Sequence, residues 1–492
     1  MTTVPAMLDD AVARFGDRPA IWHGGERTTF GELDAQADRV AAWLVGRGIR
    51  PGDRVAMRLP NDPAVPIWAH GAWRAGATLV SINPLYAQDA AAGILADSGA
   101  RIVMTVDDGV ALRAEAVVTD LAEVLGSTGP AVRAHVDPGD VAVLQYTGGT
   151  TGAPKGAMLT HANLVAGQRQ IAERCPEFVP GEERLFGAVP MMHVSGLVLA
   201  VLLSASLAAE LLVVPRFVAD EAVALVDELR PTFFPIVPTM ATMLLRVSGR
   251  ERSPSDRWSS VKVITAGAAP LAQDLQARFE ALTDRRVRPS YGGTETTAIA
   301  TLTPSDGASP GSSGSPMPGT TVEIRSLEDP EVVLPAGERG EIAIRGPQVA
   351  KGYWNRPEET AEFFSGGAFR SGDIGLVDDD GFLHVVDRLK DMIIASGYNV
   401  YPATVERAVF THPAVAETIV IGVPDDYRGE TVKAYVVLNP GHTLELEELQ
   451  EHLRGRLSPI ELPRQLEIRD ELPKTAVGKL SRKDLREEEI GA

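Results

Sequence analysis

The hydrophobic pattern of this chain changes at a long segment rich in glycine, serine and proline, residues 303–320. Before this segment, helical spacing alternates with short apolar runs such as residues 210–215 and 261–267. Alternation of this kind predicts parallel strands covered by helices. After the segment, apolar and polar residues alternate with a period of two, which predicts antiparallel strands. We therefore expect an α/β region, a loop over residues 303–320, and then a small antiparallel subdomain.

The chain is longer than one ordinary domain. Its 492 residues predict two or three hydrophobic cores, because single cores stop growing at about 250–300 residues. A further α/β pattern follows Arg388, with an amphipathic helix after two apolar runs. We therefore expect a large N-terminal region and a separate C-terminal domain.

Charge and cysteine content restrict the function classes. The formal net charge of −19 argues against nucleic-acid binding, which depends on lysine and arginine. The single cysteine, Cys175, cannot form an internal disulfide, fits a reducing cytoplasm, and is expected to be buried. The N-terminus lacks the apolar core of a signal peptide. The longest apolar run, residues 196–215, contains Glu210 and is expected to be a core helix leading into a strand rather than a membrane span.

A glycine- and threonine-rich run, "YTGGTTGAPKG", predicts an anion site. Its glycines allow successive backbone N–H groups to point inward, its threonines can donate hydrogen bonds, and Lys155 adds a positive charge. No hydroxyl residue follows the lysine, unlike the loop of mononucleotide-binding proteins. The following residues, 158–164, are expected to open a helix whose dipole would also attract a phosphate. An ordinary surface turn is the alternative interpretation.

A second stretch, "SYGGTETT", combines an aromatic residue, a hydroxyl and an acid. Tyr291 can pack on a nucleobase, Thr294 can contact a phosphate, and Glu295 can help to hold Mg²⁺, which takes one or two carboxylates together with substrate phosphates. Taken alone, the stretch also fits a simple turn.

Two charged positions flank a predicted hairpin. Asp373 precedes its first strand and Arg388 follows its second, while residues 378–380 form the turn and are expected to be solvated. A carboxylate can accept both ribose hydroxyls, and a guanidinium suits ribose or phosphate.

Near the C-terminus, Lys479 lies in "PKTAVGK", where a solvated basic tail is the simpler interpretation.

Six motifs in this order, "YTGGTTGAPKG", "GAAPL", "YGGTET", "SGD", "DRLKD" and "PKTAVGK", resemble the adenylate-forming superfamily of acyl-CoA synthetases, peptide-synthetase adenylation domains and firefly luciferase. The likeness covers most of the chain. It implies an α/β fold with two α/β sheets and a small antiparallel β-barrel at about residues 310–389. These would form an N-terminal AMP-binding domain, residues 1–389, followed by a mobile α+β C-terminal domain, residues 390–492.

The resemblance implies an acid–thiol ligase. A carboxylic acid reacts with ATP to give acyl-AMP and pyrophosphate, and a thiol, usually that of coenzyme A, then attacks the acyl-AMP. Lys479 matches the adenylation lysine and Glu295 the magnesium ligand. The ATP-binding residues implied by the motifs are Thr147, Gly148, Gly149, Thr150, Thr151 and Lys155 on the departing phosphates, Gly267, Ala268, Ala269, Pro270 and Tyr291 at adenine, Thr294 at the α-phosphate, and Asp373 and Arg388 at ribose.

The second half-reaction implies domain alternation. In the family the C-terminal domain swings about a hinge after the "DR" pair, which here is Lys390. After this rotation, Gly397 and Tyr398 would face the active site and line the channel for the thiol.

The acyl pocket implied by the resemblance is almost entirely apolar. Its residues are His193, Phe233, Val237, Gly267 and Gly293, and whether His193 acts as a gate or only packs there stays open. Ser290 stands where malonate-activating relatives carry arginine, and residues 232–245 contain no aspartate to hold an amino acid. An uncharged pocket suits a medium- or long-chain fatty acid, with an aryl acid as the alternative.

Coenzyme A is the expected acceptor, and an acyl carrier protein is a possible one, as in acyl-AMP ligases. Two other classes remain to be compared. A luciferase-like enzyme would add oxygen chemistry that nothing in the sequence requires. A nucleotide-binding protein with an inactive site is disfavoured because Lys479, Glu295 and Asp373 are all present.

Overall fold

The computed structural model describes residues 2–106, 114–127, 129, 132–147, 154–248, 256–307, 309–396, 398–425, 428–474 and 480–491. The chain divides into two compact units. The first unit comprises Met1–Val322, Ile344–Arg370 and Asp380–Leu383, and the second comprises Glu323–Ala343, Ser371–Asp379 and His384–Ala492. The domain boundary expected between residues 389 and 390 stays a prediction.

One sheet of the first unit is parallel except at one edge. Strands β3, β4, β5, β6 and β7 pair in parallel, while β8 returns antiparallel to β7. In spatial order the strands are β6 (Ala116–Val118), β5 (Ile102–Thr105), β3 (Arg54–Arg58), β4 (Thr78–Ser81), β7 (Val141–Thr147) and β8 (Lys155–Thr160).

The other sheet of the first unit has a parallel centre with antiparallel edges. The central strands β1, β10, β9, β11, β12 and β13 pair in parallel. In spatial order the strands are β15 (Ser315–Pro316), β14 (Thr301–Leu302), β13 (Val287–Tyr291), β12 (Val263–Ala266), β11 (Phe233–Ile236), β9 (Arg184–Gly187), β10 (Glu210–Val213), β1 (Pro19–His23) and β2 (Glu26–Thr29).

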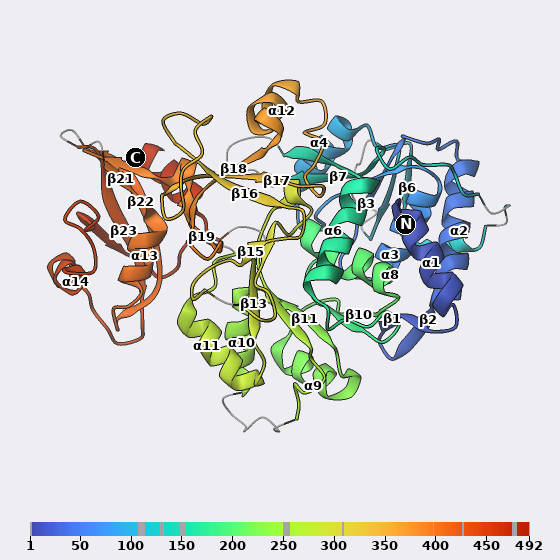
Figure 1. Cartoon of the computed structure of the whole chain (residues 1–492), viewed down its shortest axis with the longest axis horizontal. Coiled ribbons are helices and arrows are strands. Elements are labelled where there is room, and N and C mark those ends of the chain that lie inside the picture. The colour runs from blue at the N-terminus through green and yellow to red at the C-terminus, as the bar shows by residue number, and fades with distance from the viewer. Residues whose placement is uncertain are drawn as a thin grey trace. The chain divides into compact units, whose positions relative to one another are not determined.

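Helices cover both sheets of the first unit (Figure 1). They are α1 (Val4–Phe15), α2 (Phe30–Gly46), α3 (Ala64–Arg74), α4 (Gln88–Ser98), α5 (Leu121–Leu125), α6 (His161–Arg174), α7 (Val194–Gly196), the π-helical turn η1 (Leu197–Leu202), α8 (Leu203–Leu207), α9 (Ala219–Leu229), α10 (Pro238–Ser248), α11 (Gln273–Thr283), the 3₁₀ turn η2 (Thr294–Thr296), α12 (Pro357–Phe363) and η3 (Ser365–Gly367).

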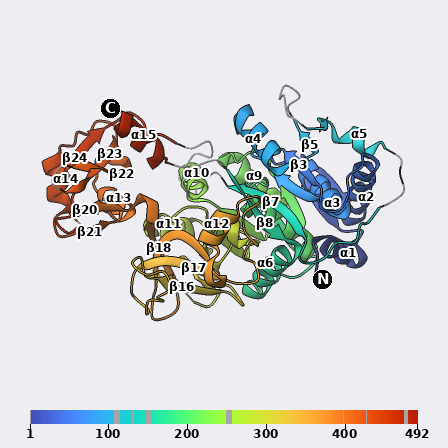
Figure 2. The ribbon, with the colours of Figure 1, turned by 90° about the horizontal axis from the view of Figure 1, so that it is seen from above.

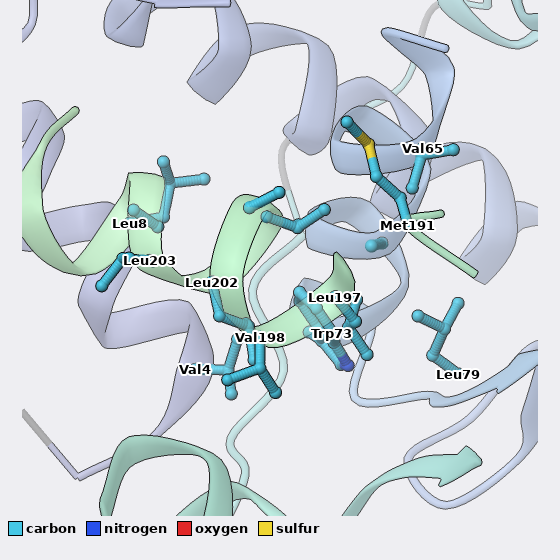
Figure 3. Close-up of a cluster of buried hydrophobic side chains, with 14 of the residues drawn as sticks. Val4, Leu8, Val65, Trp73, Leu79, Met191, Leu197, Val198, Leu202 and Leu203 are labelled. Carbon is cyan, nitrogen blue, oxygen red and sulfur yellow. The ribbon is translucent and has the colours of Figure 1, made fainter. Parts of the chain in front are cut away.

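The largest core of the first unit forms where α1, α3 and the apolar segment η1–α8 pack together. Figure 3 shows Val4 and Leu8 of α1 close to Val198 and Leu203 of that segment, and all four are buried. Trp73 of α3 is fully buried beside them, and its indole N–H donates to the Ala142 carbonyl at 2.9 Å. That hydrogen bond ties the helical layer to β7, which leads into the predicted phosphate loop.

The second unit contains most of one small sheet and all of another. The small sheet runs in the order β16 (Thr321–Arg325), β17 (Gly340–Arg345), β18 (Phe369–Val377) and β19 (Leu383–Arg388). Where a small barrel was predicted, the described strands therefore form a sheet with β16 and β19 at its edges. The other sheet contains β21 (Tyr398–Val400), β20 (Ile393–Ala395), β23 (Gly429–Leu438) and β22 (Val415–Asp425), and β24 (Gln465–Ile468) pairs with β23.

Helices cover both faces of this last sheet (Figure 2). Alternate residues of β22 enter two different cores: Val420 packs with residues of α13 and α14, whereas Ile419 and Ile421 pack with Leu485 of α15. The period of two predicted for such strands explains this division. The helical elements of the unit are η4 (Leu389–Asp391), α13 (Pro402–Val409), α14 (Leu446–Leu453) and α15 (Arg482–Gly491).

The mixed α/β class expected from the sequence is confirmed. The run 196–215 forms buried helical turns that lead into β10, as predicted, and no helix in the described ranges is long and apolar enough to cross a membrane. Residues 303–320 are mostly irregular, but β15 within them pairs with β14 and extends the sheet.

Candidate active site

Four predicted segments meet at one edge of the sheet that contains β9, β11, β12 and β13. These strands are parallel, with Ile236 beside Ala266 and Ala266 beside Pro289, so their carboxyl ends share an edge. Ligands bind at this edge in open α/β sheets. The segments that leave it carry His193 after β9, Val237 after β11, Gly267, Ala268, Ala269 and Pro270 after β12, and Tyr291, Gly293, Thr294 and Glu295 at the end of β13.

The backbone is constrained at this edge. A Cβ atom on Gly267 would lie 2.7 Å from the Ser290 hydroxyl, so a side chain at this position would force that hydroxyl to move. Ala268 follows with a φ of 65°, and Thr297 and Ala298 have φ of 51° and 74°. Left-handed non-glycine residues are costly and concentrate at functional sites. Their presence on two adjacent loops supports a binding site here.

The segment that leads to His193 is fixed from the neighbouring sheet. The Asn61 side-chain amide donates to the carbonyls of Gly187 and Val189, and its oxygen accepts the Met191 N–H at 2.8 Å. The Ser81 hydroxyl and the Gln145 amide both donate to the Met192 carbonyl. His193 is thereby held at the start of α7, although its role as a gate stays a prediction.

The phosphate loop joins two antiparallel strands. Tyr146 pairs with Gly156 and Thr147 with Lys155 across β7 and β8. Residues 158–164 open a helix as predicted, since α6 begins at His161 with Thr160 as its N-cap, but β8 (Lys155–Thr160) stands between the loop and that helix. The helix dipole acts within the first turn, so it does not reach the loop. Any bound phosphate would depend on backbone N–H groups, hydroxyls and Lys155.

Lys155 and Glu295 lie on two sides of one buried tyrosine. The Tyr353 hydroxyl donates to Glu295 Oε1 at 2.6 Å, and the Lys155 ammonium lies 5.4 Å from the centre of the Tyr353 ring and 4.9 Å from that of Phe363. Burial, together with the nearby Glu295 carboxylate, raises the pKa of Tyr353, so the phenol stays protonated and can donate.

The sequence reasoning missed Tyr353. Its signal was available as "GYWN", two adjacent large aromatics between a glycine and an asparagine in a polar stretch.

In the second unit, the two residues of the predicted ribose clamp are brought together. Arg388 Nε lies 3.3 Å from the Asp373 carboxylate, across the β18–β19 pair. Asp373 lies within β18 rather than before it as predicted, next to Gly372, which has a φ of 69° and whose N–H donates to Glu341 at 3.2 Å. The Asp378–Asp380 turn is closed by Gly381, with φ of 83°, as predicted for a hairpin.

Lys390 lies in the η4 turn. Partial burial and the guanidinium groups of Arg388 and Arg486 lower the pKa of Lys390. Tyr398 begins β21 and is 66% exposed.

Six predicted site residues lie outside the described residues: Gly148, Gly149, Thr150, Thr151, Gly397 and Lys479.

Phe233 lies away from the sheet edge that carries Val237, and its predicted place in the acyl pocket stays a prediction. It is the first residue of β11, at the opposite end of the strand from Val237, and is buried in the core with its ring 5.6 Å from that of Phe178. Arg288 is also directed into the core, where its guanidinium donates to the carbonyls of Thr303 and Arg174. Neither side chain therefore shapes the edge at which Gly293 lies.

Cys175 is buried, as predicted, and burial raises the pKa of its thiol to about 11. The Cys175 thiol is therefore protonated at neutral pH, and a protonated thiol is a poor nucleophile.

Comparisons with known proteins agree with the motifs. The family model described as "AMP-binding enzyme" matches residues 8–354, and "AMP-binding enzyme C-terminal domain" matches residues 404–479. A long-chain-fatty-acid–CoA ligase of Bacillus subtilis (strain 168) is 37% identical, over 99% of this chain and 94% of its own. A feruloyl-CoA synthase of an Amycolatopsis species is 36% identical, over 95% of each chain.

A solved structure is similar over the same span. O-succinylbenzoate coenzyme A synthetase from Bacillus subtilis, in complex with ATP and magnesium ion, has a TM-score of 0.88 and 29% sequence identity, covering 98% of this chain and 99% of that one. The chain belongs to the AMP-binding enzyme family, which confirms its predicted place in the adenylate-forming superfamily.

Proposed function

We propose that this enzyme activates a medium- or long-chain fatty acid as acyl-AMP and transfers the acyl group to coenzyme A. The observation that carries the proposal is the gathering of the "GAAP" and "YGGTET" segments at one sheet edge, within the unit that also holds Lys155. The predicted enzyme class, an AMP-forming acid–CoA ligase, is confirmed by the full-length likeness to ligases of that class.

The first half-reaction brings two anions together. A carboxylate oxygen attacks the α-phosphorus of ATP, the bond from that phosphorus to the bridging oxygen breaks, and pyrophosphate leaves. The barrier is mainly electrostatic, so fixed cations and oriented donors lower it. We assign Lys155, Thr147 and the glycines between them to the departing phosphates, Thr294 to the α-phosphate, and Lys479 to the charge that develops between carboxylate and α-phosphate.

The residues at this edge fit a magnesium ion. Magnesium prefers oxygen ligands and uses few carboxylates, and Glu295 supplies one carboxylate beside the Thr294 hydroxyl. When bound, the ion would supply positive charge against the phosphates of the nucleotide. Glu295 is the residue that would hold it.

For the nucleoside, we assign Tyr291 and the Gly267–Pro270 turn to adenine. Asp373 and Arg388 suit the ribose because the carboxylate accepts hydroxyl hydrogen bonds while the guanidinium fixes its orientation. In the second half-reaction the thiol sulfur attacks the acyl carbonyl, the carbon–sulfur bond forms, and the bond from that carbon to the phosphate oxygen of AMP breaks.

The proposed acid is apolar and carries one carboxylate. The Ser290 hydroxyl is engaged with the Ala266 carbonyl at 3.1 Å, and Arg288 is buried elsewhere, so neither is placed to bind a second carboxylate. At Gly293, an added Cβ would meet only Glu295 Oε2 among the described residues, at 3.4 Å, and we assign this position, with His193 and Val237, to the acyl chain. An aryl acid is the second candidate because a feruloyl-CoA synthase is among the relatives.

The deciding experiment is a substrate panel. Pyrophosphate release is measured with ATP, magnesium and straight-chain acids from hexanoic to hexadecanoic, together with benzoic and ferulic acids, with and without coenzyme A. We expect the fastest turnover with the longer fatty acids and only when coenzyme A is present. Turnover with none of these acids would contradict the ligase, and preference for ferulic acid would favour the aryl candidate.

The pocket is tested separately with Gly293→Leu. A leucine side chain would occupy space beside Glu295, so we expect the preferred acid to become shorter. A hydrophobic pocket discriminates about 10–200-fold per methylene, which gives the size of shift to measure. An unchanged chain-length profile would place the acyl chain elsewhere.

Lys479 is tested through the two half-reactions. Lys479→Ala should lower acyl-AMP formation by about 10²–10³-fold, while thioesterification of supplied acyl-AMP continues. The matched control is Lys474→Ala, because Lys474 forms an exposed ion pair with Glu417 at 2.9 Å and has no proposed role. Equal loss of both half-reactions in Lys479→Ala would contradict this assignment.

Domain alternation is tested at the hinge. Lys390→Pro restricts the torsions there, so acyl-AMP should form but thioester formation should become slower than in the wild type. An unchanged overall rate would exclude Lys390 as the hinge.

Three further expectations stay predictions: an acyl carrier protein as acceptor, a thiol channel at Gly397 and Tyr398, and a cytoplasmic location.

A further inference from the structure

Tyr353 occupies a central place in the first unit that the proposed roles do not use. Its ring is 6% exposed and packs edge-on against Phe364, with ring centres 5.5 Å apart. Its hydroxyl donates to Glu295 Oε1 at 2.6 Å. A buried tyrosine hydrogen-bonded to a carboxylate holds that carboxylate in one orientation, since the phenol itself cannot move without disturbing its packing.

Strand pairing places this tyrosine. Residues 351–354 run beside β8: the Lys351 N–H donates to the Met158 carbonyl, the Met158 N–H to that of Gly352, and the Trp354 N–H to that of Gly156. Tyr353 itself bridges to Ala157. β8 begins at Lys155, so the segment that carries Tyr353 is held in register with the strand that leaves the phosphate loop.

The backbone of Glu295 belongs to the same assembly. The Glu295 carbonyl accepts the N–H of Ala350 at 2.8 Å, just before the strand-paired segment begins. The side chain is therefore fixed at one oxygen by Tyr353, and its other oxygen, Oε2, lies on the side of Gly293. Both the main chain and the carboxylate of Glu295 are positioned by residues 350–353.

The same ring also contacts Lys155. The Lys155 ammonium lies 5.4 Å from the ring centre, a cation–π contact, while the hydroxyl donates to Glu295. Tyr353 therefore contacts one residue assigned to the phosphates and the residue assigned to magnesium.

We propose that Tyr353 is a positioning residue, which orients the Glu295 carboxylate to hold magnesium. This inference rests on the proposed function, because Glu295 is the assigned magnesium ligand there. Partners of this kind behind metal ligands typically contribute about 10–100-fold in metal affinity.

The test measures nucleotide binding rather than turnover. α,β-Methylene-ATP is titrated calorimetrically into the full-length protein at a series of MgCl₂ concentrations, without acid, so that no chemistry occurs. Tyr353→Phe keeps the ring over which Lys155 lies and removes only the hydroxyl. We expect the magnesium concentration for half-maximal nucleotide binding to rise about 10–100-fold in this variant.

Tyr435→Phe is a closely matched control. The Tyr435 hydroxyl also donates to a carboxylate, that of Glu489, its side chain is buried and Lys433 lies over its ring, but Glu489 is in the second unit and has no proposed metal role. Both variants lose a buried hydrogen bond of the same kind, so their thermal unfolding midpoints should fall similarly. Only Tyr353→Phe should change the magnesium dependence.

Four results would overturn the inference. Wild-type magnesium dependence in Tyr353→Phe, or the same increase in Tyr435→Phe, would show that the Tyr353 hydroxyl does not position the metal ligand. Binding of the nucleotide by the wild type without any need for magnesium would remove the metal role of Glu295 but leave the ligase intact. Failure of the wild type to bind the nucleotide at any magnesium concentration would overturn the proposed function as well.

Discussion

Two clusters of charged residues, one in each unit, are built in opposite ways. The phosphate-side cluster of the first unit contains Lys155, Glu295 and Tyr353. In it the carboxylate receives a hydrogen bond from a neutral phenol, and the ammonium lies over aromatic rings. The hinge cluster of the second unit pairs arginines directly with carboxylates; its members are Asp387, Asp391, Glu406, Arg482 and Arg486.

The hinge cluster links distant parts of the second unit. Arg482 Nη2 lies 2.6 Å from Glu406 of α13, and its Nη1 lies 3.2 Å from both Asp387 and Asp391, which flank Lys390, the residue proposed as the hinge. Arg486 lies 2.8 Å from Asp391. These pairs hold α15 and α13 against the end of β19.

The difference between the clusters follows from what each charge must meet. A charge that binds a charged ligand loses little if its resting partner is neutral, whereas a paired charge must first give up its partner. A charge that only joins elements is stable when paired, because an unpaired buried ion is costly. The comparison predicts that substitutions in the phosphate-side cluster reduce activity, and that substitutions in the hinge cluster reduce stability.

The largest effect is expected for Glu295→Gln. Loss of the carboxylate charge should lower acyl-AMP formation by about 10²–10³-fold, the range found when one electrostatic group is removed from an active site. The Gln oxygen can still accept the Tyr353 hydroxyl, so the free energy of unfolding should change by less than about 1 kcal/mol. Pyrophosphate release and urea unfolding measure the two quantities. A large loss of stability with little loss of activity in Glu295→Gln would show that the phosphate-side cluster serves stability rather than activity.

The next effect is expected for Arg482→Gln. Asp387, whose side chain is 1% exposed, and Glu406 would lose their guanidinium partner, and such a loss costs about 3–5 kcal/mol. Urea unfolding should show this destabilisation, while the acyl-AMP formation rate per folded molecule changes little.

Arg454→Ala is the control for Arg482→Gln. Arg454 pairs only with Glu451 on an exposed helix surface among the described residues, so its loss should change stability by about 0.5 kcal/mol or less. If both variants were destabilised equally, burial of the ion pairs would not explain the contribution of the hinge cluster to stability.

A smaller effect on the free energy of unfolding is expected when the pH is lowered, because His70 of the first unit is buried in its neutral form. Burial, with a contribution from Arg74, lowers the pKa of His70 to about 3, from 6.5 when exposed. Between pH 6.5 and 3 the unfolded chain therefore binds one more proton than the folded chain at this residue. The contribution of His70 to the free energy of unfolding falls by about 1.4 kcal/mol for each pH unit lowered in that window.

His70→Leu isolates this contribution. Neither ring nitrogen of His70 has a hydrogen-bond partner among the described residues, so the substitution removes no such bond. Urea unfolding from pH 7 to pH 4 should show a weaker loss of stability in the variant than in the wild type. Parallel curves for the two proteins would mean that His70 does not stay neutral in the fold.

The smallest effect is expected for Lys390→Gln. The pKa of Lys390 is lowered in the folded protein, so at neutral pH its positive charge opposes folding. Removing the charge should raise the free energy of unfolding by at most about 0.5 kcal/mol, as for other surface changes. A fall in stability would show that Lys390 is a stabilising member of the hinge cluster.

Much of the fold follows from local pattern. The helix over residues 30–46 begins with a reciprocal pair of hydrogen bonds between Thr29 and Glu32, and Gly48 follows its end with φ of 80°. Such caps involve residues three apart in sequence and can be read without the fold. The same holds for the hairpin turn at Gly381 and for the motifs that led to the family.

Two features near the site depend on contacts between distant residues. Residues 158–164 open helix α6 as predicted, but residues 155–160 pair with β7 first, so a whole strand separates the phosphate loop from the helix. That pairing depends on β7 and on residues 351–354, far along the chain. Phe233 was placed at the acyl pocket from motif position alone, whereas its contact with Phe178 fixes it in the core.

The sequence by itself determined the family, the order of the motifs and the residue types that can bind a nucleotide, because these depend on spacing along the chain. Only the tertiary structure decided which groups meet. Tyr353 reaches Glu295 across 58 positions of sequence, and Arg482 reaches Asp387 across 95. Contacts at such distances along the chain are set by how sheets and helices pack. No local pattern could therefore have shown that Tyr353 contacts Glu295 or that Arg482 contacts Asp387.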